Sequence, residues 1–173
     1  KGPAWSNSLF EDNAEFGYGM LLAQNTIRDR LKAKVEKIAE KTTDEAVKAA
    51  AAEYLETYTV GATNGTATDK LVAALEALEY DCEERAEVLK NKDFLAKKSQ
   101  WIFGGDGWAY DIGYGGVDHV LASKKDINIM VFDTEVYSNT GGQSSKATKT
   151  GATAQFAAGG KETKKKDLAG MAM

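Results

Sequence analysis

The feature that most constrains the fold is a glycine-rich turn set between two short apolar runs. The first run covers 101–103, and Gly104-Gly105-Asp106-Gly107 follows it directly. A helix-length segment then extends to about Ser123, and a second β-rich run covers 127–132. This order of strand, turn, helix and strand is typical of a β-α-β unit. We therefore expect an α/β fold in which these two strands are parallel and neighbouring.

The two loops that follow these strands supply the candidate site. In sheets of this kind, ligands bind beyond the carboxyl ends of the strands. Both loops, 104–108 and 133–142, emerge at that edge. Asp106 lies in the first loop and Thr134 in the second, where a hydroxyl or a following carbonyl would complete the coordination of a metal ion. We expect the site between these loops.

The Gly105-Asp106-Gly107 turn favours a metal-bound diphosphate over a dinucleotide. A dinucleotide fingerprint needs a third glycine where this chain has Tyr110, and the Asp side chain repels a bare diphosphate. Mg²⁺ placed between the carboxylate and the diphosphate removes that repulsion, because oxygen ligands hold the ion octahedrally. A tight turn without any ligand is the alternative explanation of Gly-Asp-Gly taken alone.

Composition excludes several classes of function. The chain has 173 residues, a length typical of one domain with a sizeable core. It carries 22 basic and 26 acidic residues, a net charge of −4, so nucleic acid is not an expected partner. No apolar run is long enough for a membrane span. The single cysteine, Cys82, cannot by itself hold a zinc ion or an iron–sulfur cluster.

The first half of the chain is predicted to form three helices that carry no functional signal. Thr42 followed by Glu45 forms a capping-box pattern at the start of the second helix. The polar stretch 59–68, which contains an Asn-Gly pair, is expected to end that helix. The third helix is expected over 69–90, with Cys82 as a small buried hydrophobe on its apolar face. The apolar face of the first helix is formed by Ile27, Leu31, Val35 and Ile38.

The chain is expected to be part of one domain that is truncated at both ends. It begins without an initiator Met, and its last residues stop where an apolar segment begins. Within 1–173, we expect a helical insertion over 26–98 and a cofactor-binding β-α-β core over 99–173.

Three long motifs resemble the pyruvate:ferredoxin (flavodoxin) oxidoreductases. The Gly-Asp-Gly turn, followed at a distance by a Thr ligand, resembles the motif shared by enzymes that use thiamine diphosphate. The matches cover roughly residues 1–25 and 99–173, whereas the helical middle is not diagnostic. The three motifs are Gly2–Gly17 (GPAWSNSLFEDNAEFG), Gly104–Ser123 (GGDGWAYDIGYGGVDHVLAS) and Asp133–Thr148 (DTEVYSNTGGQSSKAT).

The resemblance implies a thiamine diphosphate-binding fold, a mainly parallel sheet flanked by helices. It implies a large homodimeric enzyme that oxidatively decarboxylates pyruvate with coenzyme A to acetyl-CoA and CO₂. Electrons would pass through [4Fe-4S] clusters to ferredoxin or flavodoxin. The family places the cluster cysteines and the Glu that activates the cofactor outside this segment, so the segment alone is expected to be inactive. The enzyme would be cytoplasmic, or hydrogenosomal in an anaerobic eukaryote.

The resemblance also implies roles for individual residues. Mg²⁺ would be held by the Asp106 carboxylate, the Thr134 hydroxyl and the Val136 carbonyl. Asn139 would orient pyruvate or its adduct, and it is the single catalytic candidate. The complete set of expected cofactor-binding residues is Gly105, Asp106, Gly107, Trp108, Thr134, Glu135, Val136, Tyr137, Ser138 and Asn139.

Two other functions are consistent with the same residues. One is a related 2-oxoacid:ferredoxin oxidoreductase with a bulkier substrate, and the other is a non-catalytic, truncated α/β binding module. The chain departs from the family pattern at Lys124, where a glycine is expected, and at Lys149, where a proline is expected. The lysine-rich segment 161–166 is interpreted as a solvated loop, and attraction of acidic ferredoxin or coenzyme A phosphates is the alternative.

Overall fold

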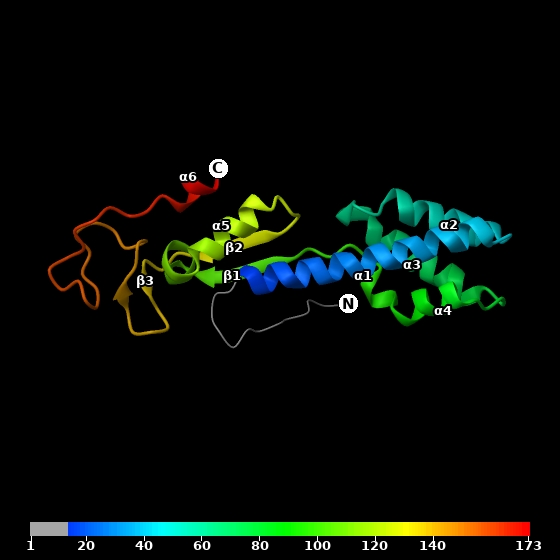
Figure 1. The fold of residues 1–173 in the computed structure, drawn as a ribbon, viewed down its shortest axis with the longest axis horizontal. Coiled ribbons are helices and arrows are strands. Elements are labelled where there is room, and N and C mark those ends of the chain that lie inside the picture. Colours follow the sequence, from blue (N-terminus) through cyan, green and yellow to red (C-terminus); the bar gives the residue numbers. More distant parts are fainter. Residues whose placement is uncertain (1–13) are drawn as a thin grey trace. The chain divides into compact units, whose positions relative to one another are not determined.

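The computed structural model describes residues 14–173, and the chain divides into two compact units. One unit comprises the residues up to Met20 together with Gln100–Met173, and the other is Leu21–Ser99. Helix α1 (Ala14–Lys41) contributes residues to both units (Figure 1). The part of the Gly2–Gly17 motif that precedes residue 14 lies outside the described residues.

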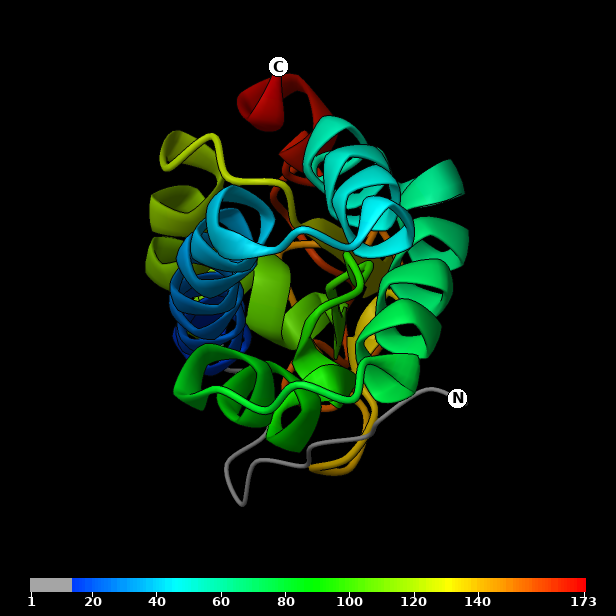
Figure 2. The ribbon, with the colours of Figure 1, turned by 90° about the vertical axis from the view of Figure 1, so that its right-hand side faces the viewer.

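The unit Leu21–Ser99 is built from helices. Helices α2 and α3 pack side by side, and α4 packs against α3 (Figure 2). Its elements after α1 are α2 (Glu45–Glu56), α3 (Gly61–Ala77), α4 (Glu83–Lys90) and a 3₁₀ turn at Lys92–Phe94. Its core includes Leu31, Val35, Ile38, Val47, Ala51, Tyr54, Leu71, Leu75, Val88 and Leu95. The apolar face predicted for the first helix is therefore buried at Leu31, Val35 and Ile38, and Ile27 packs partly buried against the same core.

The polar stretch 59–68 does follow the end of α2 at Glu56, but the prediction that it precedes the third helix is wrong. Most of the stretch belongs to α3, and Asn64 lies inside this helix and is fully buried. Its side-chain oxygen accepts hydrogen bonds from the Arg28 guanidinium at 3.3 Å and from the Lys97 backbone amide at 2.6 Å. Arg28 is itself buried, and it also donates to the Leu95 carbonyl at 3.0 Å. These tertiary hydrogen bonds outweigh the local turn preference of an Asn-Gly sequence.

The helix predicted over 69–90 is two helices with an extended break between them. Helix α3 ends at Ala77 and α4 begins at Glu83. Cys82 is half-buried at the N-terminal boundary of α4 rather than on a continuous apolar stripe. The capping prediction also needs correction, because Asp44, not Thr42, caps α2 by accepting hydrogen bonds from two backbone amides of its first turn.

The other unit contains the predicted β-α-β pattern. Strands β1 (Trp101–Gly105) and β2 (Asn128–Phe132) are parallel neighbours, in register from Trp101 opposite Asn128 to Gly105 opposite Phe132. The connection between them contains the π-helix Gly107–Ile112 and helix α5 (Tyr114–Ala122). The α/β class and the parallel pairing of these strands are confirmed.

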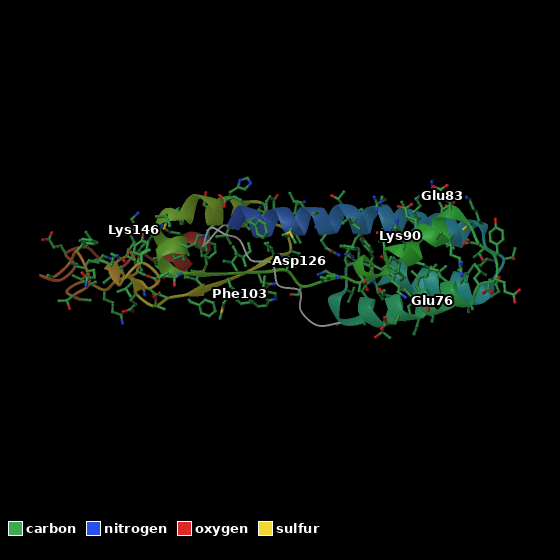
Figure 3. All side chains as sticks on the ribbon, turned by 90° about the horizontal axis from the view of Figure 1, so that it is seen from below. Glu76, Glu83, Lys90, Phe103, Asp126 and Lys146 are labelled. Carbon is green, nitrogen blue, oxygen red and sulfur yellow. The ribbon has the colours of Figure 1, made fainter. Side chains whose placement is uncertain are left out.

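The two faces of this sheet differ. Ile102 is buried in a core shared with α5, whereas Phe103 lies on the opposite face of β1 (Figure 3). On that opposite face the Phe103 ring stacks between Trp101 and Phe132, with ring centroids 5.9 and 6.1 Å apart. The core on the α5 side contains Ala14, Ile102, Trp108, Ala109, Tyr110, Val117, Val120 and Ala147.

A short hairpin and an extended segment follow the sheet. Strand β3 (Val136–Tyr137) pairs with β4 (Gln143–Ser144) in antiparallel register. The chain ends in a short helix, α6 (Leu168–Ala172). Among the described helices, none is both long enough and apolar enough to cross a membrane.

Candidate metal and diphosphate site

The parallel strand pair brings the two predicted loops together. Strand β1 ends at Gly105 and β2 ends at Phe132, and these two residues are partners in the ladder. Asp106 therefore follows one strand immediately, and Thr134 follows the other by two residues. Asp106 is only 1% exposed, which is rare for an aspartate unless it is well bonded.

The Asp106 carboxylate is bonded at both of its oxygens. Oδ1 accepts hydrogen bonds from the Thr134 backbone amide at 3.1 Å and from the Thr134 hydroxyl at 2.8 Å. Oδ2 accepts a hydrogen bond from the Ser145 hydroxyl at 2.6 Å. The predicted proximity of Asp106 and Thr134 is thus present in the structure.

The oxygen atoms around Thr134 have the spacing of metal ligands. Besides Asp106 Oδ1, the Thr134 hydroxyl lies 3.1 Å from the Val136 carbonyl and 2.8 Å from the Ser138 hydroxyl. In an octahedral Mg²⁺ site with bonds of about 2.1 Å, neighbouring ligands are about 3 Å apart. The Thr134 hydroxyl therefore lies at the distance of an adjacent Mg²⁺ ligand from both the Asp106 carboxylate and the Val136 carbonyl.

The candidate metal ligands are of three chemical types, a carboxylate, a hydroxyl and a carbonyl, and each would coordinate through oxygen. Within residues 14–173, no group of three or more His, Cys, Asp or Glu side chains is placed to hold a metal. Zn²⁺ and similar ions prefer nitrogen and sulfur ligands, whereas Mg²⁺ prefers oxygen and keeps several positions for water or phosphate. The residues present therefore fit the oxygen coordination of Mg²⁺.

Two glycines of the turn allow close packing at this edge. A Cβ atom on Gly107 would lie 2.4 Å from the Tyr137 ring, and one on Gly104 would lie 2.2 Å from the Trp108 ring. Trp108 is buried, and its indole nitrogen has no hydrogen-bond partner among the described residues. The structure places Trp108 in the core, so its contact with a diphosphate stays a prediction.

An ion-pair network holds the loop that carries Thr134. Asp133 accepts a hydrogen bond from Tyr110 at 3.0 Å and forms an ion pair with Lys165 at 2.6 Å. Burial alone would raise the pKa of Asp133, but the bonds from Lys165 and Tyr110 hold the pKa below its usual value. Glu135 pairs with Lys149 at 3.0 Å, and this contact lowers the pKa of Glu135.

Asn139 lies in the exposed turn that joins β3 to β4. The hairpin is closed by a hydrogen bond from the Gly142 amide to the Tyr137 carbonyl at 2.8 Å, and by one from the Thr140 hydroxyl to Gln143 at 2.6 Å. The turn therefore belongs to the same loop as Thr134 and Val136. The role of Asn139 toward a substrate stays a prediction.

Sequence reasoning assigned no role to Ser145 or Thr148, although both lie in the third motif. Both are buried. The Thr148 hydroxyl accepts a hydrogen bond from the Ser145 amide at 2.9 Å and donates one to the Glu135 carbonyl. The Ser-x-x-Thr spacing is a local signal for such a turn, but nothing local indicates the distant partners.

Comparison with known proteins supplies close relatives. The chain is 55% identical over an alignment of 177 residues to the pyruvate:ferredoxin oxidoreductase of Moorella thermoacetica, covering 99% of the chain and 15% of that protein. It is 50% identical over 172 residues to the pyruvate-flavodoxin oxidoreductase of Klebsiella pneumoniae, covering 99% and 15%. It is 46% identical over 174 residues to the mitochondrial pyruvate dehydrogenase [NADP(+)] of Euglena gracilis, covering 100% and 10%. No family model matches the chain.

These relatives confirm the resemblance that the motifs indicate. The chain is homologous over nearly its whole length to pyruvate:ferredoxin and pyruvate-flavodoxin oxidoreductases. It spans about 15% of their length.

Proposed function

We propose that this segment binds the diphosphate and Mg²⁺ of thiamine diphosphate within an enzyme that oxidatively decarboxylates pyruvate. The observation that carries the proposal is the meeting of the Asp106 carboxylate with the Thr134 hydroxyl, 2.8 Å apart, beyond the carboxyl ends of two parallel strands. The Val136 carbonyl, 3.1 Å from the same hydroxyl, completes the set.

Each residue of the site has a separate task in this proposal. Asp106, Thr134 and Val136 bind Mg²⁺ through oxygen, and the negative charge of Asp106 offsets part of the charge of the ion. Gly105, whose side-chain position is open, allows the diphosphate to approach the backbone closely, and Gly107 lies in the same turn. When bound, thiamine diphosphate supplies the nucleophilic carbon that protein side chains lack.

Asn139 acts on the substrate in this proposal. Its neutral amide donates a hydrogen bond to the pyruvate carboxylate or to the oxygen on which charge develops. A donor that is already oriented stabilises that charge without further reorganisation, so Asn139 orients and polarises but is not a nucleophile.

The proposed partners are those that the relatives are named for, which are pyruvate and ferredoxin or flavodoxin. The proposed reaction uses coenzyme A and yields acetyl-CoA and CO₂ in a cytoplasmic homodimer, with ferredoxin or flavodoxin as electron acceptor. The proposed [4Fe-4S] clusters need cysteines from outside this segment, because its sequence contains a single Cys.

The decisive experiment is titration calorimetry of thiamine diphosphate, with and without Mg²⁺, on the complete polypeptide. The Asp106→Asn variant keeps the side-chain volume but removes the charge that faces Mg²⁺, so we expect at least a 100-fold loss of Mg²⁺-dependent affinity. Asp118→Asn, at an exposed position of α5 in the same unit, is the matched control. Unchanged affinity in Asp106→Asn would exclude Asp106 from the site, and absence of binding to the wild type would favour a non-catalytic module.

A further inference from the structure

We propose that Ser145 is a positioning residue that gives the site its preference for Mg²⁺ over Ca²⁺. It does so by holding one oxygen of Asp106, so that the carboxylate has a single oxygen for the metal. This inference rests on the proposed function, because it concerns the metal that accompanies thiamine diphosphate.

The two oxygens of Asp106 face different partners. Oδ1 faces Thr134, whose hydroxyl lies 2.8 Å away, and Oδ2 faces Ser145, whose hydroxyl donates from 2.6 Å. Asp106 is 1% exposed and Ser145 is 4% exposed, so water does not compete for this bond. A hydrogen bond from a hydroxyl to a buried carboxylate is strong and fixes the rotation of the carboxylate plane.

The direction of the Ser145 hydroxyl is determined by its other contacts. Its oxygen accepts a hydrogen bond from the Ala147 backbone amide at 3.0 Å, which leaves its single proton for Asp106. The Ser145 amide in turn donates to the Thr148 hydroxyl, which donates to the carbonyl of Glu135. The segment that fixes the carboxylate therefore also fixes the backbone between Thr134 and Val136.

This arrangement discriminates between the two cations because their coordination differs. Ca²⁺ takes six to eight oxygen ligands at about 2.3–2.6 Å and often binds both oxygens of one carboxylate. Mg²⁺ takes six at about 2.0–2.1 Å with near-ideal octahedral angles. With Oδ2 held by Ser145, Asp106 suits the monodentate Mg²⁺ geometry, and a bidentate metal would compete with the Ser145 hydroxyl for Oδ2. Without the hydroxyl, the carboxylate is free to rotate and to offer both oxygens.

The test measures both metals separately on the complete polypeptide in the presence of excess thiamine diphosphate. In Ser145→Ala, we expect the Mg²⁺ dissociation constant to rise about tenfold, the usual effect of removing a group that orients a metal ligand. The Ca²⁺ dissociation constant should change by less than about threefold, because the bidentate mode becomes available. The Mg²⁺ to Ca²⁺ preference should therefore fall by about threefold or more.

Two further variants isolate the hydroxyl. Ser144→Ala alters the neighbouring serine in β4, which is half-buried, and should leave both dissociation constants unchanged. Ser145→Thr retains a hydroxyl and should restore the metal preference. Because both readouts are binding constants, neither depends on turnover.

The outcomes separate this inference from the proposed function. Equal weakening of both metals in Ser145→Ala would make Ser145 merely structural and overturn the inference, as would no change for either metal. If the wild type binds neither metal together with thiamine diphosphate, and Asp106→Asn behaves like the wild type, the proposed function itself fails and the inference fails with it.

Discussion

Asn139 and Asp106 lie in the same candidate site, but substituting Asn139 should impair turnover, whereas substituting Asp106 should impair cofactor binding. In the complete enzyme, Asn139→Ala should keep thiamine diphosphate and Mg²⁺ bound and lower pyruvate turnover by about 100-fold or more. A single oriented donor to developing negative charge contributes about 2.7–4 kcal/mol to transition-state stabilisation, which corresponds to that loss of rate. Steady-state kinetics combined with cofactor quantification per protein chain measures both quantities.

The control for Asn139 is the neighbouring residue of the same turn. Thr140→Ser retains the hydroxyl that bonds Gln143, so it should preserve both turnover and cofactor content. If Asn139→Ala released the cofactor and kept full activity per bound cofactor, Asn139 would be a metal or diphosphate contact and not a substrate-orienting residue.

A single backbone angle explains why glycine is expected at one position where the chain departs from the family pattern. Lys124, where the resemblance predicts a glycine, has a φ of +52°. This left-handed conformation costs a non-glycine residue about 1–2 kcal/mol, whereas glycine adopts it freely. The family expectation of glycine therefore has a local physical cause, unrelated to the metal site.

At the scale of elements, the loop after β2 depends on its ion pairs. Lys165→Met removes the partner of Asp133, and a half-exposed pair of this kind contributes about 1 kcal/mol or less. We therefore expect hydrogen exchange in 133–138 to become up to about fivefold faster at neutral pH. Mass spectrometry of the complete protein measures this rate, and Lys164→Met, at an exposed neighbouring position, is the control.

The Asp133–Lys165 ion pair predicts that the stability of the loop after β2 depends on pH. Because the folded pKa of Asp133 lies below its ordinary value of 3.8, the pair stabilises the loop fully above the unfolded pKa. The stabilisation is lost as the pH falls through the lower, folded pKa. Measured at the same pH, the difference in the free energy of opening of 133–138 between Lys165→Met and the wild type, obtained from their exchange rates, should be constant above about pH 5. It should shrink below pH 4. A difference that persists undiminished at pH 3 would contradict the ion-pair explanation.

Elements with a strong local pattern could be predicted from the sequence. The strands β1 and β2 have apolar runs and a glycine-rich turn between them, and their parallel pairing follows from the connection. The meeting of Asp106 with Thr134 then follows from where parallel strands end. These inferences need only hydrophobic pattern and topology.

Contacts that depend on distant partners could not be predicted. Ser145 bonds a carboxylate 39 residues earlier in the chain, and Lys165 bonds one 32 residues earlier. A lysine-rich segment carries no pattern that distinguishes a solvated loop from a bonded one. In the structure, Lys161 and Lys166 also donate to backbone carbonyls. The interpretation of 161–166 as a solvated loop is therefore wrong for Lys161, Lys165 and Lys166. The predicted start of the third helix was wrong around Asn64 for the same reason, because the hydrogen-bond partners of Asn64 lie far from it in the sequence.

At the scale of the whole molecule, the proposed reaction needs iron–sulfur clusters, and a sequence with a single cysteine cannot supply their ligands. The 173-residue chain contains one cysteine and spans about 15% of its relatives. We therefore predict that the isolated chain, supplied with thiamine diphosphate, Mg²⁺, pyruvate and coenzyme A, reduces no viologen dye above background. The complete polypeptide, assayed anaerobically in parallel, should reduce the dye. Pyruvate-dependent reduction by the chain alone, within tenfold of the complete protein, would contradict this prediction.

The burial of Trp108 has an optical consequence. Its indole is 1% exposed, lies two residues after Asp106, and has no hydrogen-bond partner within the described part of the chain. An indole in such a dry environment emits at shorter wavelengths than one in water, and its quantum yield responds to charge placed nearby. With the other two tryptophans of the sequence replaced by phenylalanine, the protein would contain a single tryptophan, close in sequence to its candidate metal ligand, which can be excited selectively over the tyrosines. Occupancy of the site would then be readable as a change in emission, without any added label.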